Sequence, residues 1–503
     1  MKMVKSLLLG SAAGVVAVVG AQAADLPVKA KPVEYVKICT LYGEGFYYIP
    51  GTDICLKLGG YIRADYGYRV TGARTPEYFG VEGRHTRASN EWSTRHRFNL
   101  NIDTRTQTPY GTLRTFGSAH FQNEDAANAA AFDNTLTVAR AFIQWAGFTF
   151  GRTQSFTDSI SIGDGGVGSL HQTQNQSDTG ASGTNQIAYT WELGNGMSLS
   201  IGADERRTKR LVNLANTSIP VGTEPGDSRG GNLHMNPWVA FKINQAWGRF
   251  SLAAIANRNN ATYYSQTANP VTGATGCPPG AQPGTTQCFY PDDAWGFAIL
   301  AGGEIKTPFL GPRDTLFWFV NYGQGASAYA AGSNLASPGL FGSGNQVGFG
   351  ALTDGVFVTG SQIELTTAWT AAGGYQHWWT NNFMTAVYGT YTEVSYNDTV
   401  KNSRWFCGGG GAAAPSYTIP AGRACDPDWR YWTVGVVQNW YPTPGFRLAV
   451  DVLWVNVDTA FAGPVTLTSS AINPRPTGAY DAKDLGTLSV VFRAQRTFPA
   501  AAD

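Results

Sequence analysis

The chain has 503 residues, of which 61 are glycine, 13% are aromatic and 14% are charged. Soluble proteins average about 7% glycine and about 25% charged residues, so this composition argues against an ordinary soluble enzyme. The formal net charge of +1 gives no electrostatic reason to expect a nucleic-acid partner. Abundant glycine, tryptophan and tyrosine are instead typical of a transmembrane β-barrel, whose aromatic side chains mark both membrane interfaces.

Residues 1–23 have the pattern of a secretory signal peptide. Two lysines precede an apolar run over residues 7–19, and the small-residue site AQA follows. This pattern predicts cleavage after Ala23 and export from the cytoplasm, with residues 24–53 as an N-terminal segment tied to the rest of the chain. The alternative is a retained anchor helix, but the run is shorter than the about 20 residues that span a bilayer.

Six cysteines fall into three local pairs. These are Cys39 with Cys55, Cys277 with Cys288, and Cys407 with Cys425. An even number behind a signal peptide indicates disulfides within loops, although six cysteines allow 15 connectivities. The sequence has no CxxC motif and no Cys/His cluster, so neither a zinc site nor a cofactor is predicted.

Sixteen amphipathic segments follow one another along the chain. They lie at 55–68, 94–103, 111–121, 136–146, 147–156, 185–193, 197–206, 237–244, 248–258, 294–305, 314–323, 362–369, 383–394, 431–440, 446–457 and 485–498. Apolar and polar residues alternate within them, which predicts half-buried strands. Short turns, among them one over 371–382, alternate with much longer connections. The sequence therefore predicts an all-β protein, a 16-stranded antiparallel transmembrane β-barrel over 54–498 around an aqueous channel rather than a packed core, with a tail at 499–503.

Several stretches resemble the porins of alphaproteobacteria, a group that includes rhizobia and brucellae. They are ADLPVKAKPVEYVKICTLYGEGFYYIPGTDICLKLGGYIRADYGY, RAFIQWAGFTFGRTQSF, FVNYGQGA, YQHWWTNNFMTAVYGTYTEVSYN and FRAQRTF, in the right order and spacing. The resemblance implies a homotrimeric, multi-pass porin of the bacterial outer membrane, in contact with its lipid and lipopolysaccharide. It also implies passive diffusion of small hydrophilic solutes and ions, and a third extracellular loop folded into the lumen. The cysteine pairs 277/288 and 407/425 lie outside the stretches that carry the resemblance.

The polar faces of neighbouring strands carry many basic residues. A charge facing lipid at mid-membrane costs about 2–4 kcal/mol, so these faces are expected to point into the lumen. The predicted basic wall consists of Lys57, Arg63, Arg95, Arg97, Arg114, Arg140 and Arg493. For each arginine alone, the alternative is a structural ion pair with a luminal acid. By the same alternation His96 falls on the lipid face, and His120 is a candidate for the lumen.

The connection between the fifth and sixth predicted strands is acidic. It contains Asp158, Asp164 and Asp178, and its glycine, serine and glutamine residues allow it to enter the lumen without burying apolar surface. We expect these acids to face the basic wall across the narrowest part of the channel. Facing opposite charges would select solutes by size and charge. The alternative is a solvated surface loop.

Three other functions can be compared with the sequence. Gly163, Gly165 and Gly168 satisfy G-x-G-x-x-G, but no βαβ unit surrounds them, so nucleotide binding is not expected. A barrel-embedded hydrolase would need a serine paired with a base, and the six histidines are scattered; no enzyme activity is predicted. A surface adhesin or receptor would share the barrel and the long loops, but would not conduct ions.

Overall fold

A computed structural model of the chain describes most of the residues that follow the signal-peptide pattern. The described residues are 37–71, 75–76, 90–125, 132–159, 166–171, 179, 183–205, 207, 210–214, 228–264, 277–281, 287–332, 339–341, 345–403, 426–460, 462–467 and 478–499. None of the helices in these ranges is long and apolar enough to cross a membrane. The chain divides into two compact units, residues 1–55 and 56–503.

The first unit is a small disulfide-bonded segment. It contains a short 3-10 helix, η2 (Thr40–Tyr42), and the two-residue strand β1 (Tyr47–Tyr48). Cys39 and Cys55 form a disulfide with 6.0 Å between their Cα atoms, and both are buried beside Phe46. The structure confirms this pair and also the Cys277–Cys288 disulfide. The third predicted pair, Cys407 and Cys425, lies outside the described residues.

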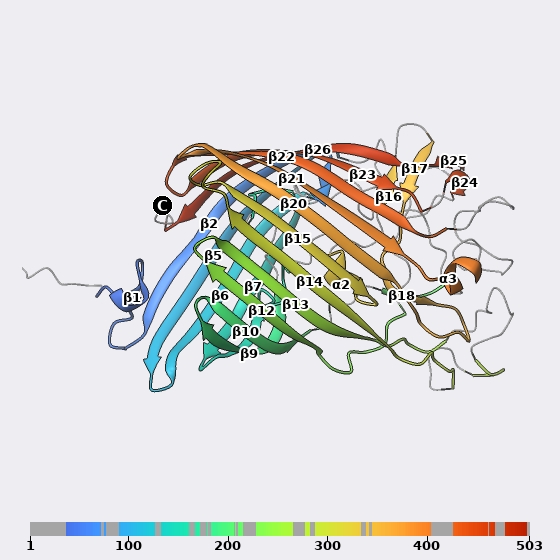
Figure 1. The fold of residues 1–503 in the computed structure, drawn as a ribbon, viewed down its shortest axis with the longest axis horizontal. Helices are drawn as coiled ribbons and strands as arrows, with labels where there is room; N and C mark the ends of the chain where they lie inside the picture. Colours follow the sequence, from blue (N-terminus) through green and yellow to red (C-terminus); the bar gives the residue numbers. More distant parts are fainter. Residues whose placement is uncertain are drawn as a thin grey trace, which may run out of the picture. The chain divides into compact units, whose positions relative to one another are not determined.

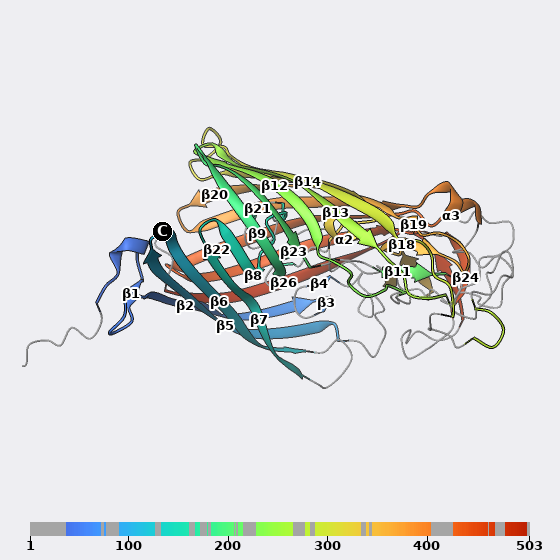
Figure 2. The same cartoon turned by 90° about the horizontal axis from the view of Figure 1, so that it is seen from below.

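The second unit is dominated by sixteen long strands. These are β2 (Cys55–Tyr68), β5 (Trp92–Thr108), β6 (Gly111–Asp125), β7 (Phe132–Trp145), β8 (Phe148–Thr153), β9 (Thr184–Gly194), β10 (Met197–Asp204), β12 (Asn236–Gln245), β13 (Gly248–Asn259), β14 (Ala294–Lys306), β15 (Thr315–Gln324), β20 (Thr367–Thr380), β21 (Phe383–Ser395), β22 (Trp429–Thr443), β23 (Phe446–Asp458) and β26 (Leu485–Phe498). Each pairs with its neighbours along the chain, and β26 pairs antiparallel with β2 to close the ring. The predicted 16-stranded antiparallel barrel is therefore confirmed, and Figures 1 and 2 show its wall of long strands.

One predicted turn is wrong. Residues 371–382 contain Gly373 and Gly374, which favour a turn in sequence, but β20 continues through both glycines to Thr380. A Cβ on Gly374 would lie 2.6 Å from a side-chain methyl of Val167. The glycine therefore marks a close approach to the strand, which is the other usual role of a glycine inside a sheet.

The connections differ between the two ends of the barrel. At one end they are short, as at Ala146–Gly147, and at the other end most are long. The long connections contain β3 (Val70–Thr71), β4 (Thr75–Pro76), β11 (Arg210–Asn213), α2 (Ser327–Ala330), β16 (Gly339–Phe341), β17 (Gln346–Phe349), β18 (Thr353–Phe357), β19 (Glu364–Leu365), α3 (Asp398–Ser403), β24 (Gly463–Leu467) and β25 (Gly478–Ala482).

The two faces of the barrel wall differ as the alternation predicts. On β2, Ile62 is 59% exposed on the outer face, whereas its neighbour Arg63 is 7% exposed on the inner face. The interior departs from the prediction on the side of β20–β23. There, inner-face residues such as Tyr431 and Leu453 join residues of the long connections in one apolar cluster. Part of the interior is therefore a packed core, because the inner faces of these strands carry apolar as well as polar residues.

Candidate pore wall and inner loop

The centre of the predicted basic wall is a buried carboxylate shared by two arginines. Asp65 on β2 accepts hydrogen bonds from Arg95 on β5 and from Arg493 on β26, whose Nε lies 2.6 Å from Oδ1. β2 and β26 are neighbours only because the ring closes, and their register places Asp65 opposite Arg493. All three side chains are almost completely buried. For Arg95 and Arg493, the structure therefore contains the alternative named above, an ion pair with a luminal acid.

Arg63 and Arg97 flank this cluster and contact amides. The Nε of Arg63 donates to Oε1 of Gln495 at 2.7 Å, and the Nε of Arg97 donates to Gln122 at 2.8 Å. The Arg63 guanidinium also lies over the ring of Tyr61, 4.6 Å from its centroid. Hydrogen bonds to side-chain amides hold both cations in fixed orientations on the inner wall, and aromatic stacking adds to this for Arg63.

A second carboxylate orders the part of the wall nearer the short turns. Asp103 on β5 accepts from Arg105 and from Arg114, each with a 3.0 Å contact to Oδ2. Arg114 also donates to Gln144 at 3.1 Å. These arginines keep 28% and 30% of their side-chain surface exposed. Asp103 was not among the predicted site residues, although it shares the polar face of its strand.

Arg140 and Lys57, the other two predicted wall residues, also lie on the inner faces of their strands. Arg140 faces Ser118 in the β6–β7 register and donates to the carbonyl of Ala139. Lys57 is half-buried on β2. His120 is buried on the inner face, while His96 is exposed beside Tyr66 on the outer face. The alternation therefore assigns both histidines correctly.

The acidic loop between β8 and β9 begins in a buried network. Asp158 lies 3.0 Å from Arg207 and accepts from Thr179. Arg207 also contacts Asp204, at 3.2 Å, and its guanidinium lies over Tyr329 of α2. Burial alone would lower the pKa of Arg207, but Asp158 and Asp204 outweigh it and raise that pKa above its ordinary value. The base of the loop is thereby joined to two other connections.

The tip of the same loop is held by Asp451 on β23. Its carboxylate accepts from the backbone N–H of Leu170 at 2.7 Å and of His171 at 3.2 Å. It also accepts from the hydroxyls of Ser169 at 2.9 Å and Tyr388 at 2.8 Å. The loop thus crosses from β8 and β9 to the inner faces of β21 and β23.

Neighbouring contacts strengthen this attachment. Arg447 donates to the carbonyl of Gly168 and to Asn439, and Val167 and Leu170 are buried in the apolar cluster of the β20–β23 side. Residues 166–171 are therefore folded into the barrel, as predicted for this loop. The anchor residues Asp451 and Arg447 were not predicted, since a single inward charge on a strand does not reveal which loop it binds.

The three predicted loop acids have different outcomes. Asp158 is described, and its hydrogen-bond partners are Thr179 and Arg207 rather than the basic wall. Asp164 and Asp178 lie outside the described residues. That the loop acids and the basic wall face each other across a constriction stays a prediction.

Ser169, His171 and Asp451 deserve comparison with a hydrolase triad. His171 Nδ1 lies 3.1 Å from the Asp451 carboxylate, but the Ser169 hydroxyl donates to that same carboxylate and lies 2.9 Å from the Tyr388 hydroxyl. A triad needs the serine hydroxyl on the histidine, and all three side chains are buried. Within the described ranges, no group of three or more His, Cys, Asp or Glu side chains could hold a metal ion.

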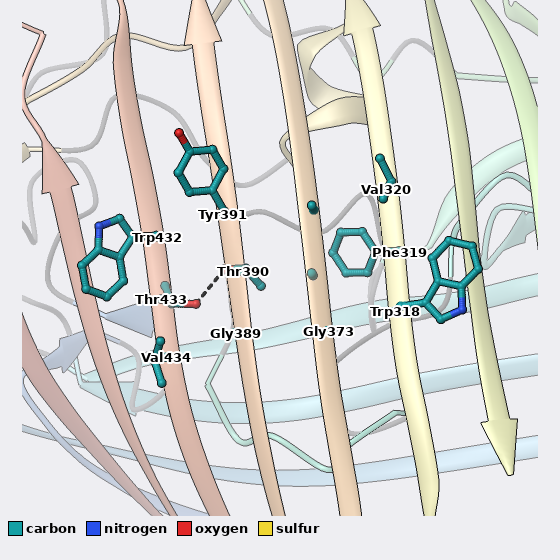
Figure 3. A pocket seen from close by; sticks show the side chains of 12 residues that line it. Trp318, Phe319, Val320, Gly373, Gly389, Thr390, Tyr391, Trp432, Thr433 and Val434 are labelled. Carbon is teal, nitrogen blue, oxygen red and sulfur yellow. Dashed lines mark hydrogen bonds between the residues drawn. The ribbon is translucent and has the colours of Figure 1, made fainter. Parts of the chain in front are cut away.

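A shallow groove of about 510 Å³ lies on the outer wall over β15, β20, β21 and β22. Figure 3 shows Trp318 and Trp432 on opposite sides of Gly373 and Gly389, which form its floor. Val434 on its edge is 50% exposed. The groove is apolar and belongs to the lipid-facing surface, not to the interior.

The comparisons with known proteins agree with this architecture. A family profile described as the porin subfamily matches residues 25–485. The chain belongs to this porin family. It is therefore a multi-pass protein of the bacterial outer membrane, and the short turns of such barrels face the periplasm while the long connections are extracellular.

The porin is similar to curated relatives over part of its length. It is 38% identical over 212 residues to Porin Omp2b of Brucella melitensis biotype 1 and 36% identical over 204 residues to Porin Omp2a of Brucella abortus. These matches cover 40% of this chain and span about half of the relatives, 54% and 50%. The solved outer membrane channel DcaP of Acinetobacter baumannii shares the fold, with a TM-score of 0.54, 13% identity, and coverage of 90% of this chain and 99% of that one.

Proposed function

We propose that the chain is a homotrimeric general-diffusion porin, through which small hydrophilic solutes and ions cross the outer membrane passively. In this proposal residues 1–23 are removed on export. Outer-membrane lipid and lipopolysaccharide surround the barrel, and the protein carries out no chemical step on its solutes.

The observation that supports this proposal most directly is the charged inner face of β5 and β6. Arg105 and Arg114 keep 28% and 30% of their side-chain surface exposed within the ring of strands. Exposed charge on the inner face of a closed barrel is expected where water passes through it. An adhesin or receptor barrel has no need of charges there, so this feature favours the channel.

The ordered guanidinium groups would also select among solutes. Between two charges 4 Å apart, the interaction is about 4 kcal/mol at the effective dielectric near a protein surface, against about 1 kcal/mol in bulk water. Arginine stays charged at every physiological pH. We infer that the basic wall, together with the loop acids, biases which ions pass.

Planar-bilayer recording tests the proposal. Purified protein should insert in steps of ohmic conductance, and a salt gradient should give a reversal potential that depends on the wall charges. Unboiled protein should run as a compact trimer, because closed barrels satisfy every backbone group internally. Ligand capture without conductance would favour the receptor alternative and contradict the porin proposal.

A further inference from the structure

Much of the connection between β15 and β20 is buried. Its described residues are 325–332, 339–341 and 345–366, and the parts at 325–332 and 345–366 are called here the inner segment. All four residues of α2 are buried, and so is every residue from 350 to 359. A connection that merely covered the extracellular mouth would expose one side to water. In both views α2 lies within the outline of the barrel wall (Figures 1 and 2).

The first half of the inner segment is anchored by polar contacts. α2 packs against β14, β15 and β20. Ser327 donates to Asp354 from its backbone N–H at 2.7 Å and from its hydroxyl at 2.8 Å. The Tyr329 hydroxyl donates to Asp204 at 3.0 Å and accepts from Asn236 at 3.0 Å. Burial, reinforced by Asp204, raises the pKa of Tyr329 well above its ordinary value, so this hydroxyl keeps its proton.

The second half packs against the inner faces of β21–β23. The carbonyl of Ala351 accepts from the Trp429 indole and from the Tyr396 hydroxyl, each at 2.8 Å. Val356 and Val358 of the inner segment belong to the same apolar cluster as the inner-face residues of these strands. Val394 of β21 and Val455 of β23 have no exposed surface. The acidic loop between β8 and β9, called here the inner loop, covers other inner-face residues on this side, among them Asp451.

The β5–β8 side of the interior differs. Asn101 of β5 and Gln144 of β7 are only half-buried, although both lie on inner faces, beside the exposed charges of Arg105 and Arg114. A permeating solute needs a continuous hydrated path. The β5–β8 side offers polar and partly exposed side chains, whereas the β20–β23 side presents a close-packed apolar layer.

We propose that the inner segment is a second luminal element, fixed rather than mobile. Together with the inner loop it fills the side from β14 to β23 and confines solutes to an eccentric path along β5–β8. This inference rests on the proposed porin function. It makes the inner segment a determinant of solute size, and it brings every permeating solute close to the basic wall.

Cysteine labelling tests the proposal. Asn101→Cys, Gln144→Cys, Val394→Cys and Val455→Cys would each be treated with a charged, membrane-impermeant thiosulfonate, and the mass shift followed with time. The unsubstituted chain gives the background. We expect fast labelling at 101 and 144, and labelling at least tenfold slower at 394 and 455. Equal rates at all four positions in the intact chain would overturn the proposal.

A shortened chain tests which element gives the protection. Replacing residues 327–365 by a short glycine-serine linker should raise the labelling rates at 394 and 455 to those of the other two sites, and should increase single-channel conductance. Continued protection of both valine sites in a correctly inserted shortened barrel would assign the covering to another element and overturn the proposal. If this variant does not insert into the membrane, the labelling rates in the intact chain still test whether positions 394 and 455 are covered. Absence of conductance in the intact protein would contradict the porin function, while the labelling pattern would test the inner segment independently.

Discussion

The backbone N–H of Leu170 donates to the carboxylate of Asp451 at 2.7 Å, although the two residues are 281 positions apart in the chain. This bond, with those from Ser169 and His171, fastens the tip of the inner loop to β23. We expect Asp451→Ala to free the tip, because a buried hydrogen bond to a charged group contributes about 1.5–3 kcal/mol. Single-channel recording should show a higher and noisier conductance.

Asp293→Asn is the matched control for this substitution. Asp293 pairs with Arg258, and both side chains are partly exposed, so the pair contributes at most about 1 kcal/mol. The conductance of the Asp293→Asn variant should equal that of the unsubstituted protein. If Asp451→Ala also conducts like the unsubstituted protein, the Asp451 contacts do not hold the loop in the channel.

Arg95 and Arg97 occupy the same face of β5 but should respond differently to replacement by glutamine. Arg95 binds the buried Asp65, and removing one partner of a buried ion pair costs about 3–5 kcal/mol. Arg493 still contacts Asp65. We therefore expect the free energy of unfolding to fall by about 3 kcal/mol or less. It would be measured as a lower temperature at which the unboiled species is lost in gels.

Arg97→Gln should instead change permeation. Arg97 contacts Gln122 and Tyr61, and neither contact involves a carboxylate. We expect a reversal potential displaced toward cations, with the unfolding temperature nearly unchanged. A reversal potential identical to that of the unsubstituted protein would show that Arg97 does not act on permeating ions.

The alternation of apolar and polar residues was enough to predict the barrel and the face of each charge. Ile62 and Arg63 are on the faces expected of them, because lipid and lumen impose opposite requirements on successive residues. The residues with which these charges pair could not be predicted in the same way. Asp65 binds Arg493 only after ring closure sets the register of β26 against β2, and sequence spacing does not contain that register.

The burial of the inner segment could not be predicted from the sequence, for a different reason. Residues 350–359 are all buried, yet they have neither the length of a barrel strand nor its period-two pattern. They are rich in glycine and small apolar residues, a composition that also suits an exposed loop. Their burial depends on the inner faces of β21–β23, which the sequence predicts to be water-facing. A run of apolar residues on those inner faces, such as Leu453, Val455 and Val457, was the available signal.

Two glycines should respond oppositely to alanine. Gly60 has a φ of +154°, and a Cβ there would lie 1.9 Å from the carbonyl oxygen of Asn99 on the neighbouring strand. Gly60→Ala should therefore impair pairing of β2 with β5 and reduce the yield of folded barrel. At Gly373 the nearest atom to a Cβ is 3.7 Å away. Gly373→Ala should be neutral or stabilise by about 0.4–1 kcal/mol. Equal yields and melting temperatures for the two variants would contradict this distinction.

The Cys39–Cys55 disulfide should stabilise the first unit locally. Cross-links that close loops of about 15 residues contribute about 3 kcal/mol in the loop-entropy account, and these cysteines are 16 positions apart. Replacing both by serine should make residues 37–54 sensitive to protease without unfolding the barrel. The control, serine at Cys277 and Cys288, should leave this segment protected. Protection of the segment in both variants would show that other contacts hold it.

Asp314, in the turn between β14 and β15, should make the stability of that turn depend on pH. Its buried carboxylate accepts from the Tyr375 hydroxyl at 2.6 Å and from the backbone N–H of Trp378 at 3.0 Å, and it lies 2.7 Å from His377 Nδ1. Burial opposes ionisation, but these hydrogen bonds outweigh it and hold the pKa of Asp314 below its ordinary value.

A carboxylate whose pKa is lower in the folded state stabilises that state above its unfolded pKa of about 3.9. The contribution is lost as the pH falls from that value through the lower folded pKa. Asp314→Asn should therefore melt below the unsubstituted barrel at pH 6, and the difference should shrink between pH 4 and the lowest pH at which the barrel survives. Amide exchange at Trp378, compared between the two proteins, localises the effect to the turn. A melting difference that stays constant across this range would mean that the ionised carboxylate does not support the turn.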